Sequence, residues 1–231
     1  MNRLTAADYA DTGQWRLLIK ICRSGMGAYL QNLVYEDIEP QKLFDVKWEE
    51  NEENRLAHIE NAVYDHPAIL EDYATRLTLY DADTLFIPTA LCEEDEGLEE
   101  QYYNAVYEGK IEDLFIEKDK DITAIYRGVS GLKSFILRTF PGARVESHLM
   151  AIIKRERAAK GSRMYVDVRD KEADFVLLDD ENLLSASTHQ WKTPNDVAYH
   201  ISNILDVYGF HLSDVKLEIR GLEMEELGFS C

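Results

Sequence analysis

One order of predicted elements occurs twice in this chain: a β-hairpin, a further strand, a helix and another strand. The first copy lies within residues 15–80 and the second within residues 164–220. The repeat is one of organisation, not of sequence. Alternating strands and helices predict an α/β protein in which helices cover the sheets. The hairpins predict that these sheets are mixed rather than purely parallel.

Alternating side chains and helix-end signals define the elements of both copies. In the first strand every second residue is large and apolar, beginning with Trp15 and Leu17, which predicts one buried face. Thr193 and Pro194 are typical of a helix start, and Gly209 of a helix end. The predicted strands are Trp15–Cys22, Ala28–Leu33, Phe44–Trp48, Arg76–Tyr80, Met164–Arg169, Asp174–Leu178, Leu183–Ser187 and Val215–Arg220, with a turn at Arg23–Gly27 and helices at Asn51–Tyr64 and from Thr193 onward.

The stretch between the two copies predicts additional elements. They are an extended segment at Leu85–Ile87, a strand at Ile122–Tyr126, and helices at Glu93–Glu108, Val129–Arg138 and Ser147–Lys160. Pro141 and Gly142 interrupt this stretch. We therefore expect an N-terminal lobe over residues 1–142 and a C-terminal lobe over residues 143–231. The second lobe is expected to be abbreviated, because the chain ends soon after its last predicted strand.

Charge restricts the classes of partner. The chain has 25 Lys and Arg residues against 44 Asp and Glu residues, a net charge of -19. Duplex nucleic acids and anionic membrane surfaces attract proteins with a basic footprint, so neither is expected as a general partner. The excess of acidic residues is explained by solubility, because a high net charge keeps a protein in solution. The alternative explanation is a basic protein partner.

Cysteine usage and hydropathy predict a cytoplasmic protein. Cys22, Cys92 and Cys231 are odd in number and far apart, which fits neither a disulfide framework nor a zinc site. Residues 1–13 have no apolar stretch typical of a signal peptide. No apolar run approaches the roughly 18 residues of a membrane span.

No segment predicts catalysis, a metal site or a bound cofactor. Gly128–Ser134 begins a helix after a strand, but Leu132 separates the glycine and lysine that a phosphate-binding loop places in succession. The six histidines form no metal-binding pair. One basic cluster lies at a predicted helix end, where the helix dipole explains it. The members of this cluster are Lys154, Arg155, Arg157, Lys160 and Arg163. The alternative is that the cluster docks an acidic partner or a second copy of this protein.

Three stretches carry a resemblance to a known family. They are Leu85–Pro88 with the helix ending in Tyr102-Tyr103-Asn104, then Thr139–Ala143, and Thr193–Tyr199 leading into Val215–Gly221. From Trp15 onward, the chain resembles a family of uncharacterised bacterial proteins with the actin-like ATPase fold. This is also the fold of actin, sugar kinases, the large heat-shock chaperones, and the bacterial proteins PilM and FtsA. The resemblance implies a two-lobed, ribonuclease H-like α/β fold with mixed sheets flanked by helices, and no established function.

The nucleotide motifs of that superfamily are degraded here. Active members carry an Asp-x-Gly turn at the first hairpin, where this chain reads Lys20-Ile21-Cys22-Arg23-Ser24. At the second hairpin Asp167 remains, but Arg169 replaces the glycine that would admit a phosphate. The adenosine site needs a glycine pair after the last strand, where this chain has only Gly221.

The resemblance therefore implies a site whose chemistry is incomplete. By fold analogy, a nucleotide would bind in the cleft between the lobes, near Ser24, Gly25, Asp167, Arg169 and Gly221. The degraded motifs favour a non-catalytic scaffold that binds an unidentified protein partner or itself. One alternative is a divergent ATP-binding protein or ATPase that uses Asp167 to hold a metal ion. A small-molecule sensor that binds in the same cleft is another.

Overall fold

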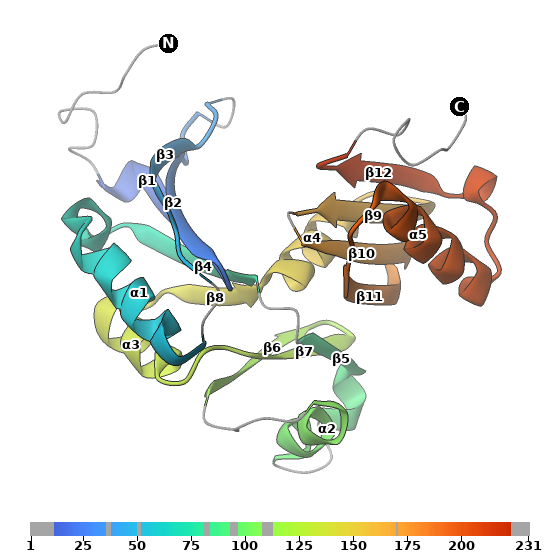
Figure 1. Ribbon diagram of the computed structural model, residues 1–231, viewed down its shortest axis with the longest axis horizontal. Coiled ribbons are helices and arrows are strands. Elements are labelled where there is room, and N and C mark those ends of the chain that lie inside the picture. Colours follow the sequence, from blue (N-terminus) through green and yellow to red (C-terminus); the bar gives the residue numbers. More distant parts are fainter. Residues whose placement is uncertain are drawn as a thin grey trace. The chain divides into compact units, whose positions relative to one another are not determined.

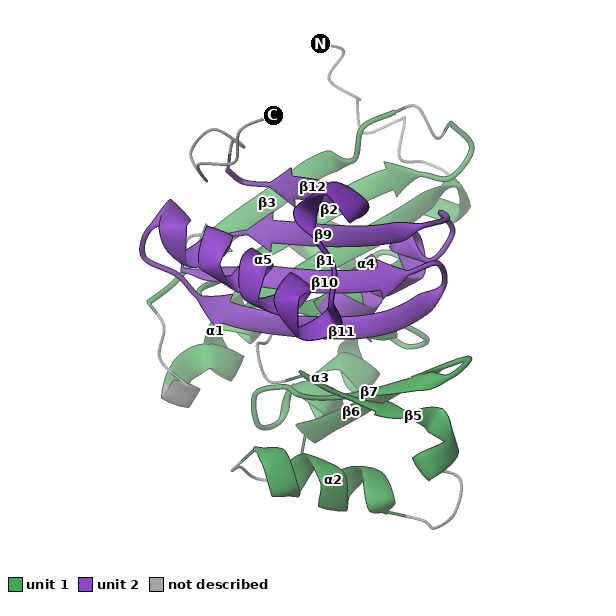
Figure 2. Cartoon of the chain, turned by 90° about the vertical axis from the view of Figure 1, so that its right-hand side faces the viewer, with its two compact units in different colours: residues 1–148 green, residues 149–231 purple. Residues whose placement is uncertain are grey.

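The computed structural model of this chain describes residues 12–35, 38–49, 52–80, 84–92, 97–107, 113–169 and 171–222. The chain divides into two compact units (Figure 2), which are residues 1–148 and 149–231. Within these described ranges, unit 1 contains two sheets and unit 2 contains one.

Unit 1 is built on a five-stranded mixed sheet in the order β3-β2-β1-β4-β8 (Figure 1). Its strands are β1 (Trp15–Cys22), β2 (Gly25–Asn32), β3 (Gln41–Lys47), β4 (Ala74–Tyr80) and β8 (Arg144–Ser147). The first three strands pair antiparallel, whereas β4 runs parallel to β1 and β8 runs parallel to β4. The loop between β1 and β2 is only two residues long, because Cys22 pairs with Gly25.

A smaller three-stranded sheet completes unit 1. It has the order β5-β7-β6, with β5 (Thr84–Pro88), β6 (Leu114–Asp119) and β7 (Ile122–Arg127). The helices described in this unit are α1 (Glu52–Tyr64), α2 (Leu98–Val106) and α3 (Leu132–Thr139). Tyr103 of α2 packs with Leu114 and Ile125 in a buried cluster, so α2 covers the small sheet.

Unit 2 repeats the arrangement with four strands in the order β11-β10-β9-β12. Its elements are β9 (Ser162–Val168), β10 (Glu172–Asp179), β11 (Asn182–Gln190), β12 (Lys216–Arg220) and α5 (Pro194–Tyr208), preceded by α4 (His148–Glu156). Helix α5 buries Val197, Ile201 and Leu205 in a cluster with Val166 and Phe175 of the sheet. Short 3-10 helices lie at Thr12–Gln14, Pro67–Leu70, Thr89–Cys92 and Leu212–Asp214.

The fold class predicted from the sequence is confirmed. In both units a hairpin is followed by a third antiparallel strand, a helix, and a strand that lies parallel to the first. The alternation predicted for β1 is also confirmed, since Trp15, Leu17, Ile19 and Ile21 are buried. Thr193 and Asp196 form a capping box at the start of α5, and Gly209 ends the helix with a φ of 74°.

Several predicted boundaries are wrong. The helix predicted from Ser147 begins at His148 and ends at Glu156, because residues 144–147 pair with β4 as a strand. The helix predicted from Val129 begins at Leu132, after Gly131 with a φ of 85°. Strand β6 was not predicted. The described part of the helix predicted at Glu93–Glu108 runs from Leu98 to Val106, and residues 93–96 lie outside the described residues.

Within the described ranges, no helix combines the length and hydropathy that crossing a membrane requires.

Candidate functional site

The hairpin turn of unit 1, Arg23-Ser24, is held by a tryptophan from the neighbouring strand. Trp48 follows β3, which pairs with β2 so that Lys47 lies opposite Gly25. The indole Nε1–H of Trp48 donates to the Arg23 carbonyl oxygen at 2.9 Å. Its backbone N–H donates to the Ser24 carbonyl oxygen at 3.0 Å. Trp48 therefore satisfies the carbonyl groups of both turn residues.

Gly25 serves strand packing. It begins β2 instead of lying in the turn, so the predicted turn at Arg23–Gly27 is too long. A Cβ atom at this position would lie 2.7 Å from the Val46 carbonyl oxygen of β3. That is closer than a side chain tolerates, so the close approach of β3 accounts for the glycine.

The hairpin turn of unit 2 is held in the same way. Trp191 follows β11, and its indole Nε1–H donates to the Arg169 carbonyl oxygen at 2.6 Å. Its backbone N–H donates to the Lys171 carbonyl oxygen at 3.1 Å. We call each of these pairs of hydrogen bonds, from Trp48 or Trp191 to a hairpin turn, a tryptophan clamp. Both clamps arise because a tryptophan directly follows the third strand of its unit.

The side chain of Arg169 points into its own hairpin. Its Nη2 donates to Asp174 Oδ1 at 2.8 Å, and its Nη1 lies 3.6 Å from Glu172 Oε2. Asp174 is fully buried and also accepts a hydrogen bond of 2.6 Å from the Thr188 hydroxyl. The backbone N–H of Arg169 donates to the Glu172 carbonyl at 2.8 Å. The residue that replaces the phosphate-admitting glycine thus ties the end of β9 to β10 through its ionic contacts, and Asp174 extends this network to Thr188 of β11 through a hydrogen bond.

Gly221 lies against the same turn. It follows β12 with a φ of 88°, a left-handed conformation that favours glycine. A Cβ atom here would collide with the Val168 carbonyl oxygen at the end of β9. Both constraints explain the single glycine at this position without a ligand.

Asp167 lies among cationic groups. Its partner in the parallel register of β9 and β12 is Arg220. The guanidinium carbons of Arg155 and Arg220 lie 4.6 Å and 5.3 Å from the ring centre of Tyr165 on the same strand. Burial raises the pKa of the Tyr165 phenol above its ordinary value, and the Asp167 charge adds to the rise. Two guanidinium groups therefore share the surroundings in which Asp167 would have to attract a metal ion.

The structure groups the predicted site residues by unit. Ser24 and Gly25 lie side by side in unit 1, and Asp167, Arg169 and Gly221 lie at one end of the sheet of unit 2. The roles of Trp48 and Trp191 were not predicted from the sequence. The sequence does contain a local signal for these roles, because each tryptophan directly follows the third strand of its copy.

Two further segments that the sequence suggested as possible binding sites have structural roles. In Gly128–Ser134, the N–H of Gly131 donates to Asp113 Oδ2 at 2.6 Å, and Lys133 Nζ donates to the Leu114 carbonyl at 3.4 Å. These contacts fix the start of α3. In the basic cluster, Arg163 is buried and donates to the carbonyl oxygens of Gly161, Glu156 and Asp180 at 2.7, 2.7 and 2.9 Å. The hypothesis that Arg163 belongs to a docking patch is therefore wrong.

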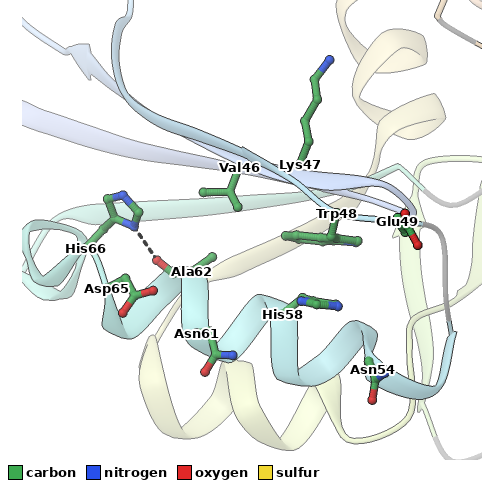
Figure 3. A pocket seen from close by; sticks show the side chains of 10 residues that line it. All are labelled: Val46, Lys47, Trp48, Glu49, Asn54, His58, Asn61, Ala62, Asp65 and His66. Carbon is green, nitrogen blue, oxygen red and sulfur yellow. Dashed lines mark hydrogen bonds between the residues drawn. The ribbon is translucent and has the colours of Figure 1, made fainter.

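A groove of about 500 Å³ lies beside the clamp of unit 1 (Figure 3). Its walls are the end of β3 and helix α1, and the indole of Trp48 forms part of it. The Trp48 ring stacks on the His58 ring with their centres 5.6 Å apart. The indole thus contributes its N–H edge to the hairpin turn and one of its faces to α1.

Replacing either clamp tryptophan by phenylalanine is expected to destabilise the protein moderately. Trp48→Phe and Trp191→Phe keep a ring but remove the hydrogen bond to the turn, which costs about 0.5–1.5 kcal/mol in each case. Chemical denaturation measures the loss. Tyr199→Phe at an exposed position of α5 is the control and should stay within about 0.5 kcal/mol of wild type. Unchanged stability in both tryptophan variants would contradict the clamp.

Comparisons with known proteins support the fold. The crystal structure of a Bacteroides thetaiotaomicron protein with an actin-like ATPase fold and unknown function has a TM-score of 0.77 at 18% identity, over 96% of this chain and 88% of that one. The cytoplasmic domain of EpsL, an inner membrane component of the type II secretion system of Vibrio cholerae, has a TM-score of 0.47 at 12% identity, over 93% of each chain. An Aquifex aeolicus Ppx/GppA phosphatase has a TM-score of 0.39 at 7% identity, over 84% of this chain and 61% of that one. The fold assignment rests on the first of these.

Family membership follows from the sequence itself. No curated protein matches the chain. The profile of a family described as protein of unknown function (DUF3822) matches residues 11–226, which is most of the sequence. The chain therefore belongs to this family of unknown function, and its fold is that of the actin-like ATPases.

Proposed function

We propose that this protein is a non-catalytic actin-like scaffold that acts by binding another protein and does not turn over a nucleotide. The hairpin turn of unit 2 carries the proposal, because the backbone N–H of Arg169 is bonded within the hairpin and the Arg169 side chain stands in place of the phosphate-admitting glycine. A phosphate-binding turn offers free backbone N–H groups and a glycine-lined opening to its ligand. In this chain the carbonyls of Arg23, Ser24 and Arg169 accept from tryptophan, and the N–H of Arg169 is bonded within its hairpin.

The side chains near the second turn favour the same proposal. Arg169 fills the position of the glycine and is bonded to buried Asp174. Asp167, the one retained acid, lies beside Arg220 in the sheet register. A metal-bound triphosphate would need Asp167 to hold the cation against this positive charge. We also propose a cytoplasmic location, in line with the three widely spaced cysteines. The net charge of -19 favours a partner that is not a nucleic acid.

The alternative is a divergent ATP-binding protein or ATPase that uses the cleft between its lobes. Its support is the retention of Asp167, which is only partly buried at the end of β9. Ser24, Gly25, Arg169 and Gly221 would then surround the nucleotide. The two proposals differ in whether Mg-ATP stabilises the folded chain.

Thermal unfolding with and without millimolar Mg-ATP is expected to give the same midpoint. A nucleotide at a hundredfold excess over its dissociation constant would add about 2.7 kcal/mol of stability. In a chain of this size such a gain raises the midpoint by about 5–11 °C. Magnesium chloride alone is the control. A magnesium-dependent rise that disappears in Asp167→Ala would overturn the proposal and establish the alternative.

A further inference from the structure

The exposed edge of β3 and the groove beside it combine into a surface suited to an extended peptide. Strand β3 is the last strand of its sheet, and among the described residues it pairs only with β2. An edge strand can accept a further strand through its outward backbone groups. In Figure 3 the groove runs along the face of β3 that looks toward α1.

The direction of the backbone groups follows from the clamp. The backbone N–H of Trp48 donates to the Ser24 carbonyl oxygen. Trp48 and Ser24 are therefore a hydrogen-bonded pair, and their backbone groups point toward each other between the two strands. Hydrogen-bonded and non-bonded pairs alternate in antiparallel strands. Lys47 and Asp45, which lie opposite Gly25 and Gly27, are therefore non-bonded positions. Their N–H and carbonyl groups point away from β2, toward the open edge.

The groove has an aromatic floor. Alternate residues of β3 and its extension face α1, and Phe44 and Trp48 stack on His66 and His58 with ring centres 4.0 Å and 5.6 Å apart. Partly exposed Val46 lies between these two stacks. In Figure 3, Val46 points toward α1 and Lys47 points away from it. An added strand would therefore place every second side chain in this groove.

The charges around the groove select the occupant. Glu49 and Asp65 are exposed at the groove, and Asn54 and Asn61 supply amide groups beside them. The chain as a whole carries a net charge of -19. A second copy would bring the same negative charge, and charged residues on an edge oppose pairing between copies. A segment with Lys or Arg at alternate positions would complement Glu49 and Asp65.

We propose that β3 binds an extended basic segment of a partner protein by strand addition, with its basic side chains in the groove toward Glu49 and Asp65. The inference rests on the proposed function, because it names the class of protein that the scaffold binds. Main-chain hydrogen bonds at Asp45 and Lys47 supply affinity, and the groove supplies the preference for charge.

The probe is a short acetylated and amidated peptide of alternating valine and lysine, titrated into the labelled protein and followed by amide NMR shifts. Saturable shifts confined to β3 and α1 are expected. A peptide with glutamate for lysine should not bind. A peptide with proline at its centre should also fail, because it lacks a main-chain donor. Equal binding of the glutamate peptide, or shifts elsewhere in the chain, would overturn the proposal.

Two variants locate the contact. Asp45→Pro removes an outward N–H while keeping the pairing with β2, and should weaken the lysine peptide about tenfold or more. Glu49→Gln combined with Asp65→Asn should weaken it several-fold and flatten its salt dependence, as Debye screening predicts. Asp206→Asn at an exposed position of α5 is the matched control and should bind normally. If Asp45→Pro does not fold, the Glu49 and Asp65 variant decides alone.

The outcomes separate this inference from the proposed function. A chain that binds neither Mg-ATP nor the lysine peptide contradicts only the strand-addition proposal. Stabilisation by Mg-ATP contradicts the proposed function, whatever the peptide does. A dimer in sedimentation that Asp45→Pro abolishes would make a second copy the occupant of the edge, and would overturn the basic partner.

Discussion

Asp174→Ala is expected to lower the free energy of unfolding by about 3–5 kcal/mol. Asp174 is fully buried and accepts hydrogen bonds from Arg169 and Thr188 at 2.8 and 2.6 Å. Its removal leaves the Arg169 guanidinium without this buried counter-charge. In a chain of this size, the loss corresponds to a fall of about 6–20 °C in the unfolding midpoint.

Two comparisons make this test specific. Asp206→Ala at an exposed position of α5 removes the same charge from the surface and should stay within about 0.5 kcal/mol of wild type. Arg169→Met combined with Asp174→Leu replaces the ionic pair by apolar groups and should recover most of the loss. An Asp174→Ala protein with a wild-type unfolding midpoint would show that the ion pair between Arg169 and Asp174 does not stabilise the hairpin. The Arg169 side chain would then be available to a ligand.

Gly221→Ala is expected to be the most destabilising of the glycine substitutions at positive φ. The left-handed conformation costs a residue with a side chain about 1–2 kcal/mol. The added Cβ would also collide with the backbone carbonyl of Val168, so β12 or the hairpin turn must shift. We expect a total loss of at least about 2 kcal/mol, measured by chemical denaturation.

The matched control is Gly209→Ala. Gly209 has a φ of 74°, and a Cβ there would meet no atom within 4 Å. This variant should lose only the conformational cost of about 1–2 kcal/mol. The difference between the two variants therefore isolates the contact with Val168. Equal losses would contradict the close packing of Gly221 on the turn.

The sequence predicted the fold class because its signals are local. The apolar alternation beginning at Trp15 and the capping residues around Pro194 act within a few residues, and both appear in the structure. Strand β8 is different, because residues 144–147 become a strand only by pairing with β4. The start of α3 was likewise set by Gly131, whose N–H bonds to Asp113, 18 residues earlier.

The site was less predictable because its contacts join distant residues. The indole bonds join residues 25 and 22 positions apart in the two clamps. The sequence places Trp48 and Trp191 directly after the third strand of each copy, but this local signal does not show that they reach the hairpin turns. Gly25 illustrates the same limit, since the sequence marks a glycine in a hairpin and only the position of Val46 gives its reason.

The indole N–H signals of Trp48 and Trp191 test the central claim most directly. We infer that both hairpin turns are fixed by the chain's own tryptophans and that no nucleotide binds beside them. In proton–nitrogen NMR spectra, titration with millimolar Mg-ATP should leave both indole signals unmoved, and both N–H groups should exchange slowly with solvent. Saturable shifts of both signals with Mg-ATP would contradict the account and establish nucleotide binding at the turns.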